Sequence, residues 1–350
     1  MDANKADSMI KDSCNYNLLR HNTFGMNVKC ARFLEFSTID DLREITSQRD
    51  IVDKPMLILG GGSNVLFVGD FPGTILHSGI KSIELIRDED TACLRCGSGE
   101  VWDDVVDYAV STGLYGAENL SAIPGEVGAS AVQNIGAYGS EVKDLIVNVE
   151  AVDVMTGETC EFSPVDCCYG YRDSKFKHEW KNRYIITYVT YRFSKKFEPK
   201  LDYGNIKSFL SSNGIDNPTA RCLRDAIISI RNAKLPDPGI LGNAGSFFVN
   251  PIISMEKYSA LSAEYQNMPH YLLDDGRVKV PAGWLIEQCG WKGRSLGNAG
   301  VYEKQSLVLV NRGGATGEEI LALCERICSD VNKRFGIEIF PEVNISFNYL

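Results

Sequence analysis

Apolar and polar positions along the chain predict a mixture of strands and helices. Apolar runs typical of strands are PMLIL and VLFVG on either side of GGGSN (55–69), TILHS (74–78), TACLRC (91–96) and RYIITYVTYRF (183–193). IVNVEAVDV (146–154), the turn residues MTGE and TCEF (159–162) predict a hairpin. Taken alone, GGGSN also reads as a hairpin turn between its two flanking strands.

Helical spacing appears in three places. Residues 101–113 put apolar side chains on one face and end on Gly113, and Thr219 can cap a helix that reaches about Ile230. Thr316 and Glu319 form a capping-box pattern before an apolar face that runs to Phe335. With SLVLVN (306–311) before that helix and IEIF (337–340) after it, we expect a βαβ unit. The predicted face of the first helix contains Val101, Val105, Tyr108 and Ala109.

These elements indicate an α+β chain of at least two parts. The composition changes between about 195 and 239, where KKFEPK and KLPDPG flank the helix that begins near Thr219. We therefore expect a domain boundary near 200–235.

Residues 113–144 hold six glycines and five alanines but only five charged side chains. A Rossmann GxGxxG between strand and helix is absent, and so is a GxxxxGK[ST] loop. Without side chains, successive backbone amides can close on a pyrophosphate. This segment and GGGSN together predict a large, flat, anionic, dinucleotide-like ligand pressed against backbone.

Composition limits the classes of function. The chain has 350 residues, 44% of them hydrophobic and 23% charged, and a formal net charge of −10. This acidic balance argues against a nucleic-acid-binding surface but leaves room for one cationic pocket. No signal-peptide pattern and no apolar run of about 20 residues is visible, so we expect a cytoplasmic protein without membrane association.

Cysteine usage predicts neither a disulfide framework nor a metal site. The count is eleven, which is odd and fits a reducing compartment. Cys93 and Cys96 in CLRC have the spacing of half a zinc site, but no second half follows.

Several motifs, in order and spacing, carry a resemblance to a known family. They are NTFG (22–25), GGGSNVL (60–66), IPGEVGAS (123–130), QNIGAYG (133–139), YGYRDS (169–174), KLPDP (234–238), LGNAGSFFVNP (241–251), PAGWLIEQCGWKG (281–293) and PEV (341–343). From about residue 17 to 346 the chain resembles the UDP-N-acetylenolpyruvoylglucosamine reductases, flavoenzymes of bacterial peptidoglycan precursor synthesis. YGYRDS and the insertion around LDYGN (201–205) make it similar to the longer of the family's two types.

The resemblance implies a fold and a cofactor. It implies an FAD-binding region of the vanillyl-alcohol-oxidase (PCMH) type over 17–200, in two subdomains of about 17–82 and 83–200, and a substrate-binding domain over 201–350. The stretch around 338–350 is expected to return to the FAD half. Non-covalent FAD would lie on Gly60, Gly61, Gly62, Ser63, Asn64, Val65, Ala122, Ile123, Pro124, Gly125, Gly128, Ala129, Gln133, Asn134, Gly136, Ala137, Tyr138 and Gly139.

The implied reaction oxidises NADPH and reduces UDP-N-acetylglucosamine enolpyruvate to UDP-N-acetylmuramate; no obligate protein partner is evident. Arg172 matches the family's guanidinium, which suits an enol ether whose carboxylate gains charge as an enolate. Glu342 would act on the same carboxylate in a protonated or hydrogen-bonded form. Ser246 matches the donor of the final proton and, as a poor acid, needs tight placement.

The resemblance also implies substrate contacts. Lys234 suits a diphosphate, and Tyr203 lies on a loop that could close over the nucleotide. The chain departs from the frequent family pattern at Val249, where FFKNP has lysine, and at Gly61, where GEGSN has glutamate. The implied substrate-binding residues are Tyr203, Lys234, Asn250, Lys292 and Gln305.

Two rival functions remain. One is a flavoprotein oxidase of the same fold, whose relatives often attach flavin through a histidine; His21, His77 and His178 are the histidines of the predicted FAD half, and none lies in the glycine motifs. The other is a binding module that has lost catalysis, which should lack Arg172, Ser246 or Glu342. All three residues are present.

Overall fold

The computed structural model describes residues 10–48, 51, 55–87 and 91–346. The chain divides into two compact units. The first comprises Met1–Tyr16, Cys30–Gly61 and Pro72–Arg231, and the second comprises Asn17–Lys29, Gly62–Phe71 and Asn232–Leu350. Each unit is therefore built from segments that are distant in the sequence.

The first unit contains a four-stranded and a five-stranded sheet. In the four-stranded sheet the order is β1 (Lys11–Asn17), β2 (Lys29–Phe36), β5 (Phe71–Ser78) and β3 (Met56–Ile58), and β3 pairs parallel with β5. Helix α1 (Ile39–Ser47) buries Leu42 and Ile45 in the same core as Leu34 and Leu76 of this sheet.

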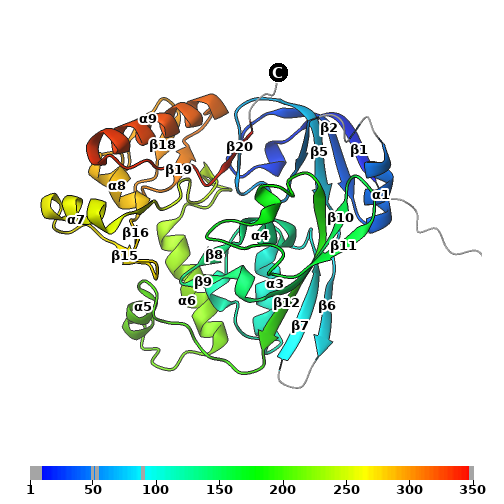
Figure 1. Cartoon of the computed structure of the whole chain (residues 1–350), viewed down its shortest axis with the longest axis horizontal. Helices are drawn as coiled ribbons and strands as arrows, with labels where there is room; N and C mark the ends of the chain where they lie inside the picture. Colours follow the sequence, from blue (N-terminus) through cyan, green and yellow to red (C-terminus); the bar gives the residue numbers. More distant parts are fainter. Residues whose placement is uncertain (1–9, 49–50, 52–54, 88–90, 347–350) are drawn as a thin grey trace, which may run out of the picture. The chain divides into compact units, whose positions relative to one another are not determined.

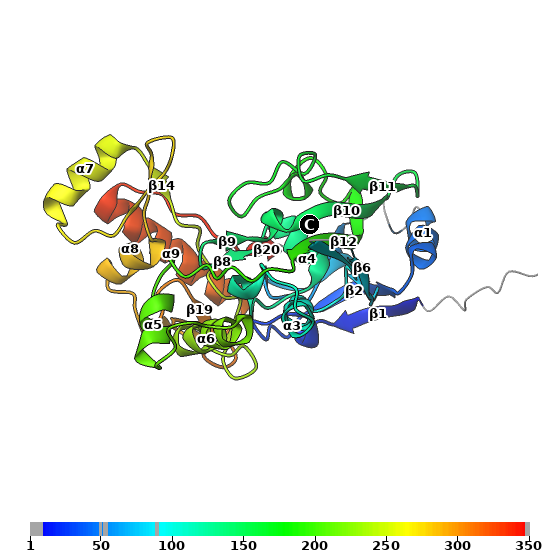
Figure 2. The same ribbon diagram turned by 90° about the horizontal axis from the view of Figure 1, so that it is seen from below.

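The five-stranded sheet is antiparallel, in the order β11 (Thr159–Phe162), β10 (Ile146–Asp153), β12 (Tyr184–Ser194), β7 (Thr91–Gly97) and β6 (Ile83–Arg87). Helices α3 (Trp102–Ser111) and α4 (Val127–Gln133) pack against it, as Figures 1 and 2 show. Trp102 stacks edge-on against Tyr191 of β12, with ring centroids 5.3 Å apart. This aromatic pair anchors the start of α3 to the sheet.

Shorter elements complete the first unit. β8 (Gly136–Ala137) and β9 (Ser140–Glu141) form a small antiparallel pair. Helix α5 (Ile206–Ser212) shares a core with α6 (Ala220–Lys234), whose last residues belong to the second unit. The single-turn helices of the described chain are η1 (Leu19–His21), η2 (Glu118–Leu120), η3 (Val142–Asp144) and η4 (Lys175–Lys177).

The second unit contains three small sheets. One has the order β13 (Gly242–Asn243), β19 (Leu309–Asn311), β18 (Ala299–Val301) and β17 (Ser295–Leu296), and α9 (Gly317–Phe335) lies against β18 and β19 (Figure 1). A second has the order β14 (Ile252–Ile253), β16 (Val278–Lys279) and β15 (Tyr271–Leu272). In the third, β20 (Asn344–Ser346) pairs parallel with β4 (Val65–Phe67). Helices α7 (Met255–Glu264) and α8 (Ala282–Gln288) complete the unit.

Most of the predicted elements are confirmed. The hairpin over 146–162, the long strand, the helix with its Thr219 cap and the Thr316–Glu319 capping box all form, because each is specified by local spacing. The helix predicted over 101–113 begins one residue later than expected. Val101 precedes the helix and is 41% exposed, so its place on the buried face is wrong, and Trp102 takes that place.

Two predicted connections are wrong. GGGSN is not a hairpin turn, because β3 and β4 pair with different partners, β5 and β20. IEIF forms no strand, and β20 does not join the sheet of β19, so the predicted βαβ unit is absent. Both errors come from the pairing of β4 with β20, which joins strands near opposite ends of the chain and is not specified by local pattern.

The predicted division into an FAD region over 17–200 and a substrate domain over 201–350 stays a prediction. In the structure, β4 and β20 both belong to the second unit, and the first unit continues to Arg231. Residues 347–350 of the stretch expected to return to the FAD half lie outside the described residues.

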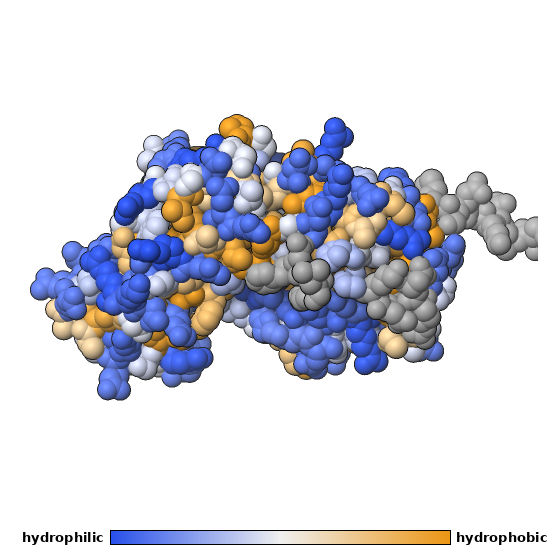
Figure 3. Space-filling view, turned by 90° about the horizontal axis from the view of Figure 1, so that it is seen from above, coloured by the Kyte–Doolittle hydropathy of each residue, from blue (hydrophilic) through white to orange (hydrophobic). Residues whose placement is uncertain are grey.

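Apolar and polar residues are interspersed on the surface in view (Figure 3). Figure 3 shows apolar residues in small groups among polar ones on the face in view. Among the residues that the structure describes, no helix combines the length and the apolar character needed to cross a membrane.

The cap of α9 gives a stability test. Thr316 Oγ1 accepts a hydrogen bond from Glu319 N at 3.2 Å, and Glu319 Oε2 accepts one from Thr316 N at 2.8 Å. Thr316→Ala should lower the free energy of unfolding by about 1 kcal/mol, measured by urea denaturation, while Thr316→Ser should change it little. Equal losses in both variants would contradict a role for the hydroxyl.

Candidate active site

In the first unit, two glycine-rich segments lie backbone against backbone. A Cβ atom on Gly61 would lie 3.6 Å from the Cα of Gly125. On Gly60 it would lie 3.5 Å from the Cβ of Ala129. The start of the GGGSN motif therefore lies along the IPGEVGAS motif, with little side-chain volume between the two chains.

The segment from Ala122 to Gly139 turns repeatedly through the left-handed region. Helix α4 accounts for its regular part and ends at Asn134, which has a φ of 46°. Non-glycine residues adopt this conformation only where the surroundings hold them there. The other residues of this segment with positive φ are Ala122 (55°), Gly125 (124°), Tyr138 (48°) and Gly139 (78°).

The same segment leaves small apolar groups on the surface. Pro124, Ala129 and Gly139 of this segment are exposed, and so is Gly61 of the GGGSN motif, although few residues near them in the sequence carry charge. The Ser140 hydroxyl, next to Gly139, is buried without a hydrogen-bond partner among the described residues. Bare backbone and exposed small apolar groups fit a flat dinucleotide laid against the main chain.

Arg172, from the YGYRDS motif, packs against the QNIGAYG segment. Its Nη2 donates to the Gly136 carbonyl oxygen, and a Cβ atom on Gly136 would lie 2.9 Å from its Nη1. Arg172 itself has a φ of 56°, in the left-handed region. A Cβ atom on Gly136 would also lie 2.9 Å from the Ser140 carbonyl oxygen, so the backbone and the guanidinium together leave room only for glycine.

Tyr203 meets the end of the same segment. Its Cβ lies 3.2 Å from where a Cβ atom on Gly139 would be, and the residue is 42% exposed. The first unit therefore brings one predicted catalytic residue and one predicted substrate residue to the predicted FAD segment.

The Asn134 side chain makes hydrogen bonds within the protein. Its side chain is fully buried and donates to the Gly170 carbonyl oxygen at 2.7 Å and to Glu141 Oε2 at 3.0 Å. It thereby ties QNIGAYG to YGYRDS. The side-chain amide of this predicted FAD residue is thus engaged with protein groups.

The second unit carries the rest of the GGGSN motif. A Cβ atom on Gly62 would lie 2.0 Å from the His21 carbonyl oxygen, and Gly62 has a φ of 64°. Asn64 Nδ2 donates to the Glu342 carbonyl oxygen at 3.5 Å, and Asn344 N donates to the Asn64 carbonyl oxygen at 3.1 Å. The parallel pairing of β4 with β20 thus places Asn64 beside Glu342.

Ser246 and Glu342 lie on neighbouring extended segments of this unit. Glu342 N donates to the carbonyl oxygen of Phe247, the residue after Ser246, at 2.7 Å. Ser246 is exposed, whereas Phe247 is fully buried. Burial of the phenylalanine anchors this extended segment, and the serine lies on its exposed side.

Two predicted substrate residues flank the start of α8. Asn250 Oδ1 accepts a hydrogen bond from Ala282 N at 2.9 Å. Gln305 Oε1 lies 3.1 Å from where a Cβ atom on Gly283 would be. Lys292 is exposed and pairs with Glu287 at 2.9 Å, and Lys234 is exposed at the end of α6.

Comparison with known proteins identifies the family. Residues 237–346 match the model of the UDP-N-acetylenolpyruvoylglucosamine reductase C-terminal domain, and residues 31–163 match an FAD binding domain. A UDP-N-acetylenolpyruvoylglucosamine reductase of Bacteroides fragilis is 52% identical over 330 residues, which cover 94% of this chain and 98% of that protein. The chain belongs to the UDP-N-acetylenolpyruvoylglucosamine reductase family.

Solved structures agree on the fold. The reductase of Thermus caldophilus superposes with a TM-score of 0.67 at 20% identity, covering 97% of this chain and 99% of that one. A 6-hydroxy-D-nicotine oxidase of Arthrobacter nicotinovorans superposes with a TM-score of 0.53 at 12% identity, covering 97% and 88%. The expected reductase family and the α+β fold of the vanillyl-alcohol-oxidase type are confirmed.

Sequence reasoning missed one charged residue of this reductase's glycine-rich segment, Glu126. Its Oε2 lies 3.2 Å from where a Cβ atom on Gly60 would be, and its Oε1 lies 3.9 Å from that of Gly61. The carboxylate of Glu126 therefore reaches the backbone of both glycines from the IPGEVGAS motif. An isolated charge in an otherwise small and apolar stretch was the available signal.

Burial raises the pKa of Glu126 to about 7, with a smaller opposing effect from the charge of Lys81 and a smaller reinforcing one from Glu35. The side chain is 13% exposed, and its Oε1 lies 4.0 Å from His77 Nε2. The carboxyl group is thus held in a largely desolvated position beside the predicted phosphate-binding backbone.

Gly62 and Gly61 test two different reasons for glycine: close packing at Gly62, and an open surface for the ligand at Gly61. Gly62→Ala should lower the free energy of unfolding by at least about 2 kcal/mol, because the methyl group would overlap the His21 carbonyl oxygen and φ is positive. Gly61→Ala, the matched control, meets nothing closer than 3.6 Å and should keep the wild-type stability in urea denaturation. A large loss of stability in Gly61→Ala would contradict the described packing.

Glu126 should make stability depend on pH. The folded-state pKa of about 7 exceeds the ordinary value of 4.5, so the protonated carboxyl stabilises the fold at low pH, and this contribution is lost as the pH rises through about 7. Between about pH 5.5 and pH 8 the wild type should lose about 2 kcal/mol relative to Glu126→Gln, measured by urea denaturation. Parallel pH profiles for both proteins would refute the raised pKa.

Proposed function

We propose that this chain reduces UDP-N-acetylglucosamine enolpyruvate to UDP-N-acetylmuramate, with Arg172, Ser246 and Glu342 as its catalytic groups. Membership of the reductase family carries the activity, the FAD cofactor, the reductant NADPH and the place in peptidoglycan precursor synthesis. When bound, FAD would supply the hydride chemistry that couples oxidation of NADPH to reduction of the enolpyruvyl group. The chain's own residues bind the substrate, stabilise charge and donate the proton.

Arg172 would stabilise the charge that develops on the substrate carboxylate. Two aligned N–H donors and a permanent charge suit an enolate better than a flexible lysine would. The anchoring of its guanidinium at Gly136 supports this role, because a fixed donor needs no reorganisation as charge develops.

Glu342 would act on the same carboxylate in a protonated form or through a hydrogen bond, since a bare carboxylate there would repel it. Ser246 would donate the proton to the carbon next to the site of hydride addition. Its place next to buried Phe247 on an extended segment that Glu342 N also binds supports a well-positioned hydroxyl, which a weak acid requires.

The substrate residues would hold the nucleotide sugar. Lys234 offers a point charge to the diphosphate, and Tyr203 lies on an exposed loop that can close over the nucleotide. Asn250, Gln305 and Lys292 would bind the remaining polar groups. We expect the enzyme to act in the cytoplasm, without nucleic acid or membrane, because its substrates are water-soluble.

Ser246→Ala tests the mechanism by separating the two half-reactions. In stopped-flow absorption near about 450 nm, NADPH should still bleach the flavin, while reoxidation by the enolpyruvyl substrate should slow by at least about 100-fold. Ser259→Ala, the same chemical change on the exposed face of α7, should leave both phases unchanged. Unchanged reoxidation in Ser246→Ala would remove this hydroxyl from the mechanism.

A further inference from the structure

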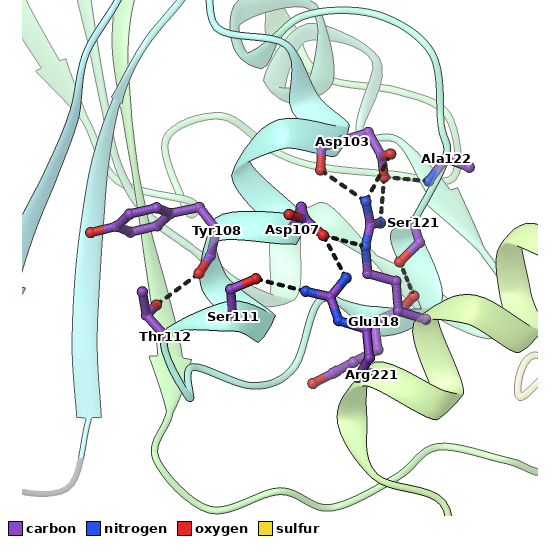
Figure 4. Close-up of polar contacts among 10 residues, drawn as sticks. Asp103, Asp107, Tyr108, Ser111, Thr112, Glu118, Ser121, Ala122 and Arg221 are labelled. Atoms are coloured by element: carbon purple, nitrogen blue, oxygen red, sulfur yellow. Dashed lines mark hydrogen bonds and ion pairs between the residues drawn. The ribbon is translucent and has the colours of Figure 1, made fainter.

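A charged network joins helix α3 to the predicted FAD segment (Figure 4). Asp103, in the first turn of α3, accepts a hydrogen bond from the backbone N–H of Ala122 at 2.6 Å through its Oδ1. Arg224 of α6 binds the same carboxylate with two donors, Nη1 to Oδ1 at 2.6 Å and Nη2 to Oδ2 at 3.0 Å. All of these groups lie in the first unit.

The hydrogen bond falls on a residue whose conformation needs support. Ala122 has a φ of 55°, which is unfavourable for a residue with a Cβ atom. A carboxylate is a strong acceptor for an amide, so Asp103 stabilises this conformation more than a neutral acceptor would. Without that bond, the chain at Ala122 would relax toward negative φ.

The start of α3 also fixes the backbone on both sides of Ala122. Trp102 Nε1 donates to the Leu120 carbonyl oxygen at 2.9 Å, and Trp102 N donates to the Gly125 carbonyl oxygen at 3.0 Å. Gly125 is the residue that lies against Gly61. Ala122 is therefore the residue between two anchored points, and its conformation sets how the chain turns into the Gly125 edge of the predicted FAD cradle.

Arg224 holds the carboxylate in one orientation. Its side chain is 7% exposed, and its planar fork matches the carboxylate in a bidentate pair. Its Nε also donates to Asp107 Oδ1 at 3.1 Å, and Arg221 Nη1 donates to the same atom at 2.6 Å. Asp107 thus shares the arginine with Asp103, but within the described part of the chain its hydrogen bonds come from Arg221 and Arg224 and not from the backbone of the FAD segment.

We infer that Asp103, oriented by Arg224, is a positioning residue for FAD: it sets the backbone of Ala122–Gly125 in the conformation that receives the cofactor. Asp103 would not touch FAD and would act only through the Ala122 amide. The inference rests on the proposed placement of FAD along this segment. It assigns a role to residues outside the glycine motifs and the catalytic groups.

Asp103→Asn and Asp107→Asn form a matched pair, since each removes one charge from the surroundings of Arg224 without changing shape. The full-length protein, freed of flavin by dialysis, is titrated with FAD and followed by flavin fluorescence. Asp103→Asn should raise the Kd for FAD at least about 10-fold, because its amide NH2 must face either the Ala122 N–H or the guanidinium. Asp107→Asn should raise it by less than about 3-fold, since water can replace an exposed carboxylate.

A second substitution distinguishes positioning from general destabilisation. Glycine adopts positive φ readily, so Ala122→Gly in the Asp103→Asn background should recover at least about 3-fold in FAD affinity. A merely structural role of Asp103 would give no such recovery. Hydrogen exchange of the Ala122 amide in the flavin-free protein should be faster in Asp103→Asn than in Asp107→Asn.

The outcomes separate this inference from the proposed function. If the wild type does not bind FAD, the proposed function fails. If the wild type binds FAD and the two Asn variants have equal affinities, or Ala122→Gly gives no recovery, the positioning role is overturned. Should Asp103→Asn not fold, Arg224→Lys against Arg221→Lys provides the same comparison, and only Arg224→Lys should weaken FAD binding.

Discussion

The close approach of one backbone to another is the constraint on which the site depends. Gly61 lies against Gly125 in the first unit, and Gly62 lies against His21 in the second. Side chains at these positions would overlap the facing chain or occupy the surface that a cofactor would cover. Missing side chains therefore serve two purposes, packing at Gly62 and access at Gly61.

A glycine-rich backbone has few side-chain contacts to stabilise its conformation. Hydrogen bonds to this segment stabilise it instead. Trp102 and Asp103 fix the turn at Ala122 and Gly125, and Asn134 ties the following turn to Gly170. Trp102 and Asn134 are buried, which makes the bonds of these two side chains costly to lose. The rigid first turn of α3 thus organises a segment that has little regular structure of its own.

Two charged side chains, Arg172 and Glu126, are held in fixed positions beside glycine backbone. Arg172 is held against the Gly136 carbonyl oxygen, where its guanidinium stays fixed, while Glu126 is desolvated beside Gly60 with its pKa raised by burial. A fixed cation suits a developing anion, and a carboxyl that is readily protonated reduces repulsion near a phosphate. Glu126 belongs to the glycine-rich segment, whereas Arg172 contacts that segment from the YGYRDS motif.

Local pattern in the sequence determined the elements whose spacing is self-contained: the 146–162 hairpin, the helix after Val101 and the capped helix α9. The order of the motifs indicated the reductase family and its FAD fold. Only the tertiary structure decided that β4 pairs with β20, that Asp103 reaches Ala122 and that Glu126 stands beside Gly60. These contacts join residues that are far apart in the chain or that lie in irregular turns. They are stabilised by burial and by hydrogen bonds between distant segments, and local periodicity in the sequence does not predict either.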